Sequence, residues 1–150
     1  MYFLMISLLM LVLPLASIFN EAGLRPDLAV TGKWFVFWMV GVRLFAAGLR
    51  QILQPRYTAE KILGIQGDAN LVVVRELGFA NLALGIGGIA TLLAPSWTAP
   101  LALVGGIFYA AAGFQHTMQS ARNRIENFAM VTDLFAAFVL LGFFVRTLRF

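Results

Sequence analysis

Five long apolar stretches, separated by short polar connections, dominate the chain. They cover residues 1–19, 33–53, 71–93, 99–115 and 128–148. A helix needs about 20 mostly apolar residues to cross a bilayer, and each stretch comes close to that length. The pattern predicts an all-α fold: a polytopic membrane helix bundle of five transmembrane helices, forming a single transmembrane domain over residues 1–150.

The ends of these stretches carry their own signals. The first lacks a positively charged start, and its apolar run is too long for a typical signal peptide, so we expect a retained helix. Pro95 and Pro100 bracket a tight turn between the third and fourth helices. Pro55 stops the second helix and opens the longest connection, residues 54–70. In that connection, apolar Ile62, Leu63 and Ile65 follow charged Glu60 and Lys61, which suggests a short helix lying in the membrane interface. The alternative is an ordinary surface loop.

Polar residues inside the predicted helices fall on faces that also carry small residues. Positions i, i+3, i+4 and i+7 share one face of a helix. These faces are Arg43, Ala46, Ala47 and Arg50; Glu76, Ala80, Ala83 and Gly87; Gly105, Tyr109, Ala112 and His116; and Glu126, Ala129, Met130, Asp133 and Ala137. Asn81 lies on a separate stripe of the third helix, with Gly78, Gly85 and Gly88.

Small residues let helix backbones approach closely, so these faces are predicted to point at protein rather than lipid. We expect Glu76 and Asp133 to pair with Arg43 and Arg50, close to the side of the membrane where the chain starts, which we call the N-side. Two interpretations stay open. The charges form a buried network that sets helix register, or they line a pocket for a ligand headgroup or a proton. The first helix carries no charge in its apolar run and is predicted to pack outside this cluster.

Gln115 and His116 end the fourth helix. They are either cap or headgroup-facing residues, or a titratable site near neutral pH. A hydrolase triad of Ser120, His116 and Asp133 has no nucleophile elbow to support it.

The composition agrees with a membrane protein and narrows its chemistry. Of the 150 residues, 61% are hydrophobic and 12% are charged, with a mean hydropathy of +0.86. The chain has no cysteine and a single histidine, which excludes disulfides, thiolate chemistry and multi-histidine metal sites within one chain. The net charge of +4 suits anionic lipid and membrane topology better than nucleic acid.

The basic residues also favour one orientation. The N-side carries Arg50, Arg56, Lys61, Arg75, Arg122 and Arg124, whereas the other side carries Arg25, Lys33, Arg146 and Arg149. Because basic residues concentrate on the cytoplasmic side, the N-terminus is predicted to be cytoplasmic.

Four segments resemble successive helices of a DoxX-like membrane protein: VRLFAAGLRQIL (42–53), VRELGFANLALGIGG (74–88), AAAGFQH (110–116) and NFAMVTDLFAAFVLLG (127–142). Such proteins have four helices, so this chain would add an N-terminal one. The chain is still more similar to an uncharacterised group of small bacterial integral membrane proteins with VRELGFANL-type helices. The resemblance implies a multi-pass protein of the bacterial cytoplasmic membrane, in some relatives beside quinone chemistry, and marks Arg43, Glu76, Asn81 and His116.

The sequence thus leaves three functions open. The first is binding of a lipid or quinone headgroup in an intramembrane pocket, or an accessory role in a membrane complex. The second is a structural subunit that self-associates through Gly85, Gly88, Gly105 and Gly106. The third is a proton-coupled transporter or membrane enzyme, although no reaction is indicated. Apart from a bound lipid or quinone, no cofactor is expected, and the partners are the bilayer, a second copy or a larger complex. The predicted ligand-binding residues are Arg43, Arg50, Glu76, Asn81, Tyr109, Gln115, His116 and Asp133.

Overall fold

The computed structural model describes residues 2–64, 66–119 and 123–148, and every regular element in these ranges is helical. Five of its helices are long and apolar enough to cross a membrane. The predicted all-α bundle with five spanning helices is therefore confirmed. Ile65, Ser120, Arg122 and Arg149, which entered the sequence predictions, lie outside the described residues.

The first two spanning helices each contain a π-helical stretch. The first consists of α1 (Tyr2–Ser7), π-helical η1 (Leu8–Val12) and α2 (Leu13–Ala22), and the second of α3 (Leu28–Phe35), π-helical η2 (Val36–Val42) and α4 (Arg43–Leu53). The others are α6 (Ala69–Ala90), α7 (Thr98–Met118), which follows the short 3-10 helix η4 (Pro95–Trp97), and α8 (Arg124–Thr147).

Two helices begin earlier than the apolar pattern predicted, because polar residues cap them. The Asp27 carboxylate accepts a hydrogen bond from the Val30 backbone N–H at 2.7 Å and starts α3. Asn123 and Glu126 form a capping box that starts α8. Such capping residues lie in the polar connection before each apolar stretch, so the hydropathy pattern alone does not reveal them.

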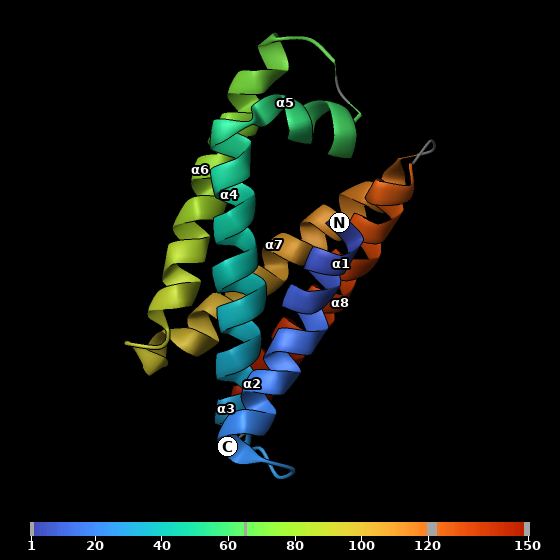
Figure 1. The fold of residues 1–150 in the computed structure, drawn as a ribbon. Helices are drawn as coiled ribbons and strands as arrows, with labels where there is room; N and C mark the ends of the chain where they lie inside the picture. Colours follow the sequence, from blue (N-terminus) through green and yellow to red (C-terminus); the bar gives the residue numbers. More distant parts are fainter. Residues whose placement is uncertain (1, 65, 120–122, 149–150) are drawn as a thin grey trace.

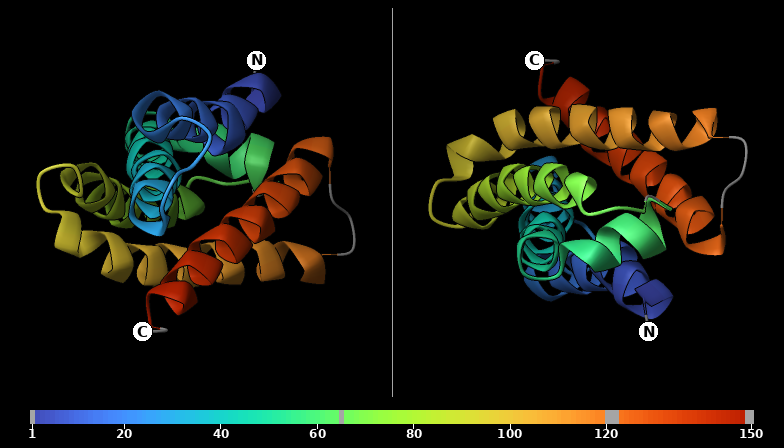
Figure 2. Two further views of the ribbon diagram at one scale, coloured as in Figure 1. Left: turned by 90° about the horizontal axis from the view of Figure 1, so that it is seen from below. Right: turned by 90° about the horizontal axis from the view of Figure 1, so that it is seen from above.

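The spanning helices form two pairs that diverge toward the N-side. α4 lies beside α6, and α7 lies beside α8 (Figure 1). The connection after α4 is helical: α5 (Pro55–Tyr57) continues into π-helical η3 (Thr58–Ile62). This short segment contacts α6 and α8 and lies across the N-side end of the bundle (Figure 2). The helical alternative for residues 54–70 is therefore the one present over Pro55–Ile62.

Glycines bring the backbone of α6 against the backbones of η2 and α4. A Cβ atom on Gly41 would lie 2.9 Å from the Ile89 backbone nitrogen, and one on Gly48 would lie 2.6 Å from the Leu82 nitrogen. A Cβ atom on Gly88 would overlap the backbone of Gly41. The two helices therefore meet without side chains between them, as small residues allow in membranes.

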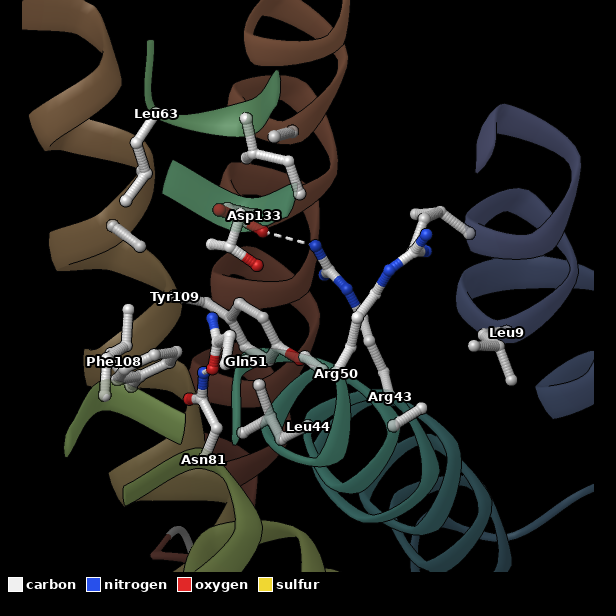
Figure 3. Close-up of a pocket in the computed structure, with 18 of the residues that line it drawn as sticks. Leu9, Arg43, Leu44, Arg50, Gln51, Leu63, Asn81, Phe108, Tyr109 and Asp133 are labelled. Carbon is white, nitrogen blue, oxygen red and sulfur yellow. Dashed lines mark hydrogen bonds and ion pairs between the residues drawn. The ribbon is translucent and has the colours of Figure 1, made fainter. Parts of the chain in front are cut away.

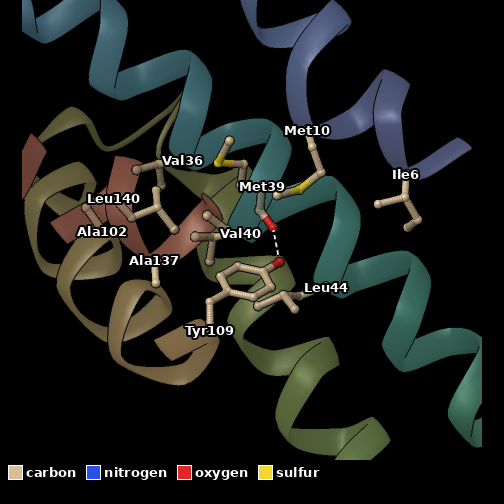
Figure 4. Packing of buried hydrophobic residues seen from close by; sticks show 11 residues of the cluster. Ile6, Met10, Val36, Met39, Val40, Leu44, Ala102, Tyr109, Ala137 and Leu140 are labelled. Atoms are coloured by element: carbon tan, nitrogen blue, oxygen red, sulfur yellow. Dashed lines mark hydrogen bonds between the residues drawn. The ribbon is translucent and has the colours of Figure 1, made fainter. Parts of the chain in front are cut away.

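Most of the largest buried side chains gather where η2 meets α7 and α8. Met39, Val40 and Leu140 are fully buried there, together with the Tyr109 ring (Figure 4). The Tyr109 hydroxyl donates a hydrogen bond to the Met39 backbone oxygen at 2.5 Å. This bond ties α7 to η2 and satisfies a buried hydroxyl.

Polar contacts on the side opposite the N-side hold the first spanning helix against the second. The Glu21 carboxylate accepts hydrogen bonds from Lys33 Nζ at 2.5 Å and from Trp34 Nε1 at 2.7 Å. Trp38 Nε1 donates to Ser17 Oγ at 3.0 Å. The first spanning helix is thus an attached part of the bundle.

The glycine contact predicts a position-specific effect on stability. We expect Gly88→Ala to lower the free energy of unfolding by roughly 1–3 kcal/mol, because the new methyl group must push α6 away from Gly41. Gly142→Ala is the matched control, since a Cβ atom there has no neighbour within 4 Å. Thermal unfolding in detergent, followed by circular dichroism, measures both. Equal stability of the two variants would contradict the close contact.

Candidate functional site

A cavity of about 420 Å³ lies in the N-side half of the bundle (Figure 3). All five spanning helices and η3 contribute to its wall. Most of the wall is apolar, with Leu9, Leu44, Leu77, Phe108 and Ala112 among the lining residues. The polar or ionisable residues on it are Arg43, Arg50, Gln51, Thr58, Asn81, Tyr109, His116 and Asp133.

An ion pair between α4 and α8 spans one side of the cavity. Arg43 Nη2 lies 2.5 Å from Asp133 Oδ1, and both side chains are buried. The same nitrogen lies 3.3 Å from Thr132 Oγ1, and Arg43 Nη1 lies 3.2 Å from Met10 Sδ. The guanidinium carbon is 4.8 Å from the centre of the Tyr109 ring. Arg43 therefore contacts three helices besides its own, and its charge is compensated inside the bundle.

An amide pair between α4 and α6 forms another polar part of the wall. Asn81 Nδ2 donates a hydrogen bond to Gln51 Oε1 at 2.8 Å, and Figure 3 shows the two side chains together at the cavity. Asn81 is only 3% exposed, yet its Oδ1 atom accepts no hydrogen bond from any described residue. Buried polar atoms without a partner are rare, so this oxygen is a candidate contact for a bound group.

Arg50 differs from Arg43 in having no acidic partner among the described residues. Its guanidinium carbon lies 3.6 Å from the centre of the Tyr57 ring, on α5. Stacking on an aromatic ring orients a guanidinium group but leaves its N–H donors available to oxygen atoms. Arg50 is thus the cation on the cavity wall that no carboxylate of the described residues neutralises.

His116 lies on the wall near the end of α7. Its Nδ1 atom is 3.4 Å from Gln119 Oε1, and the ring is buried. This contact joins the imidazole to the residue that directly follows α7.

The structure gathers six of the eight predicted ligand-binding residues at the cavity: Arg43, Arg50, Asn81, Tyr109, His116 and Asp133. Glu76 and Gln115 are exposed and do not line it. The predicted pairing of Glu76 with Arg43 or Arg50 is wrong, because α6 turns its Gly78, Gly85 and Gly88 stripe toward η2 and α4. Asn81 shares that stripe and enters the bundle, whereas Glu76 lies on the outside.

The first spanning helix contributes more than the outer packing that the sequence predicted. Met5, Ile6 and Leu9 line the cavity, and Met10 contacts Arg43. The reason is that the pairs α4–α6 and α7–α8 diverge toward the N-side, and α1 with η1 lies at the opening.

Two polar wall residues were missed by the sequence reasoning. Gln51 follows Gly48 by three positions, so it lies on the face of α4 that approaches α6; that spacing could have revealed it. Thr58 is buried in η3, and the sequence around it does not indicate that it lines a cavity. Within the described ranges, no three histidine, aspartate or glutamate side chains gather as metal ligands would.

Comparison with known proteins gives one family. A family model described as "Family of unknown function (DUF6790)" matches residues 1–149. No curated protein and no solved structure matches the chain. The similarity to DoxX-like proteins finds no support here and stays a prediction.

The buried ion pair predicts that the free energy of unfolding depends strongly on both Arg43 and Asp133. We expect Asp133→Leu to lower the free energy of unfolding by about 3–5 kcal/mol, because it leaves the buried Arg43 without its counter-charge. Combining it with Arg43→Met should recover most of that loss, since no unpaired charge remains. Glu76→Leu, which removes an exposed carboxylate, should cost little. Unfolding by titration with a denaturing detergent measures all four proteins, and a double variant as unstable as Asp133→Leu would contradict the pairing.

Proposed function

The chain belongs to this family of unknown function, and we propose that it is a multi-pass membrane protein whose N-side cavity binds the polar head of a membrane amphiphile, either a lipid or a quinone. The observation that carries the proposal is the cavity itself. Its volume of about 420 Å³ falls in the range of small-molecule sites. A mostly apolar wall with a few convergent polar groups is also typical of such sites.

The position of the cavity suits a ligand that enters from the bilayer. Ala46 and Ala111 line it and are exposed on the bundle surface. Each lies seven residues before the N-side end of its helix, which is about 10 Å along the helix axis. A head bound among the polar residues could therefore keep its apolar tail in the surrounding lipid.

Arg50 supplies the strongest attraction for an oxygen-rich head. It lies three residues before Leu53, about 5 Å from the N-side end of α4, and no described carboxylate neutralises it. A guanidinium group binds phosphate or carbonyl oxygens through several N–H donors in a fixed plane. We infer that Arg50 contacts the part of the head nearest the membrane surface.

The competing functions have less support. The glycines proposed for self-association pack within the chain instead: Gly85 on Phe45, Gly88 on Gly41, Gly105 on Val40 and Gly106 on Leu141. They are therefore not available to a second copy. A proton path through Glu76 and Asp133 lacks its first member, since Glu76 lies outside the cavity. An accessory role in a membrane complex is compatible with amphiphile binding, and we keep it as part of the proposal.

For the location, we propose the bacterial cytoplasmic membrane with a cytoplasmic N-terminus. The support is the excess of basic residues on the N-side, including Arg50, Arg56 and Arg75. In this orientation the cavity lies in the cytoplasmic half of the bilayer.

Filling the cavity should expel its ligand. We expect native mass spectrometry from lipid nanodiscs to show a bound amphiphile on the wild-type protein. Ala112→Leu should lower the occupancy at least fivefold, because leucine adds three carbon atoms to the cavity wall. A fivefold change corresponds to a loss of about 1 kcal/mol in binding free energy. Ala83→Leu is the matched control, since Ala83 is exposed on α6 away from the cavity. Arg50→Gln should reduce occupancy by an anionic lipid, whereas Glu76→Gln should leave it unchanged. A wild-type protein that carries no lipid or quinone under these conditions would end the proposal.

A further inference from the structure

The amide pair of Asn81 and Gln51 lies inside the bundle, beside the contact between Gly48 and α6. Gln51 directly follows Arg50, so the pair lies at about the same level of α4 as that arginine. The Asn81 side chain is only 3% exposed, so its oxygen has little access to water, and leaving it unsatisfied is costly. The missing partner of Asn81 Oδ1 is therefore best sought in a molecule that enters the cavity.

The two amides leave one acceptor atom and one donor atom without a partner among the described residues. Asn81 Oδ1 accepts no hydrogen bond, and the Gln51 side-chain nitrogen donates none, among the residues that the structure describes. A hydroxyl group supplies one donor and two acceptor lone pairs, so it can bridge the two side chains. If both amides turned over, they would still present one donor and one acceptor, and a hydroxyl would again satisfy both. A carbonyl or ether oxygen only accepts, so it cannot serve Asn81 Oδ1.

We propose that the cavity selects an amphiphile whose head carries a hydroxyl group, and that this hydroxyl bridges Asn81 and Gln51. The inference rests on the proposed function and adds the chemical class of the ligand. Two kinds of membrane molecule carry this chemistry: a neutral lipid alcohol such as a diacylglycerol, and a quinol. A quinone, which has carbonyls but no hydroxyl, should bind more weakly than its quinol.

The test compares probes that differ in the hydroxyl alone. Nanodiscs are loaded with dioleoylglycerol or its methyl ether and, under anaerobic conditions, with a ubiquinol or the matching ubiquinone. Native mass spectrometry then measures the occupancy of the full-length protein. For the wild-type protein we expect at least about a tenfold preference for the hydroxyl member of one pair, as the loss of one hydrogen bond to a buried group would give. The pair that shows the preference identifies the source of the ligand.

Variants assign the preference to the amides. Gln51→Leu combined with Asn81→Leu removes both partners, which leaves no unpaired amide, and it should abolish the preference while an amphiphile still binds. Asn20→Leu is the control, because Asn20 is exposed near the opposite end of the first spanning helix and should keep the preference.

The outcomes separate this inference from the proposed function. If wild-type protein binds amphiphiles but takes the alcohol and its ether, and the quinol and the quinone, equally well, the hydroxyl site is wrong and the cavity function stands. If it binds none of the probes and no lipid, both proposals fail. The wild-type comparison is decisive even if the double variant does not fold. A preference that survives in the folded double variant would also overturn the role of Asn81 and Gln51.

Discussion

The close contact between the glycines of α6 and the backbones of η2 and α4 is the constraint on which the site depends. Gly41, Gly48, Gly78 and Gly88 leave no room for side chains between the helices, so α6 can meet its neighbour through one stripe only. Asn81 belongs to that stripe and is carried into the bundle beside Gln51. Glu76 belongs to another stripe and is carried outside. One packing contact thereby decides which polar residues the cavity receives.

The charges on the cavity wall are arranged by depth. Arg43 and Asp133 compensate each other deep in the bundle, where an unpaired charge would be costly. Arg50 stays uncompensated, but it lies near the N-side end of α4 and stacks on Tyr57. Gln51 directly follows Arg50, so a ligand meets this cation and the amide pair at about the same level of α4. The arrangement suits an amphiphile whose head carries oxygen atoms for both.

The frame around the cavity is held together at the end opposite the N-side and in the middle of the bundle. On the side opposite the N-side, Glu21 holds the first spanning helix to the second through Lys33 and Trp34. In the middle, Tyr109 ties α7 to η2. At the N-side the pairs α4–α6 and α7–α8 diverge, and α1 with the segment Pro55–Ile62 lies at the opening (Figure 1). The cavity thus results from helices that are joined at one end and separated at the other, rather than from a flaw in packing.

Much of the fold could be predicted from the sequence, because the length and hydropathy of a spanning helix are set by the bilayer and need no knowledge of its neighbours. The common face of Arg43, Ala46, Ala47 and Arg50 was also predictable, because all four lie within the regular helix α4. In the structure all four line the cavity. Which of the two predicted carboxylates pairs with Arg43, and the outward position of Glu76, were decided by tertiary structure alone. Helical periodicity shows which residues share a face, but the rotation of each helix follows from which face packs most closely on its neighbour. The π-helical stretch η2 adds a second reason, because its wider turns shift the phase of residues before and after it.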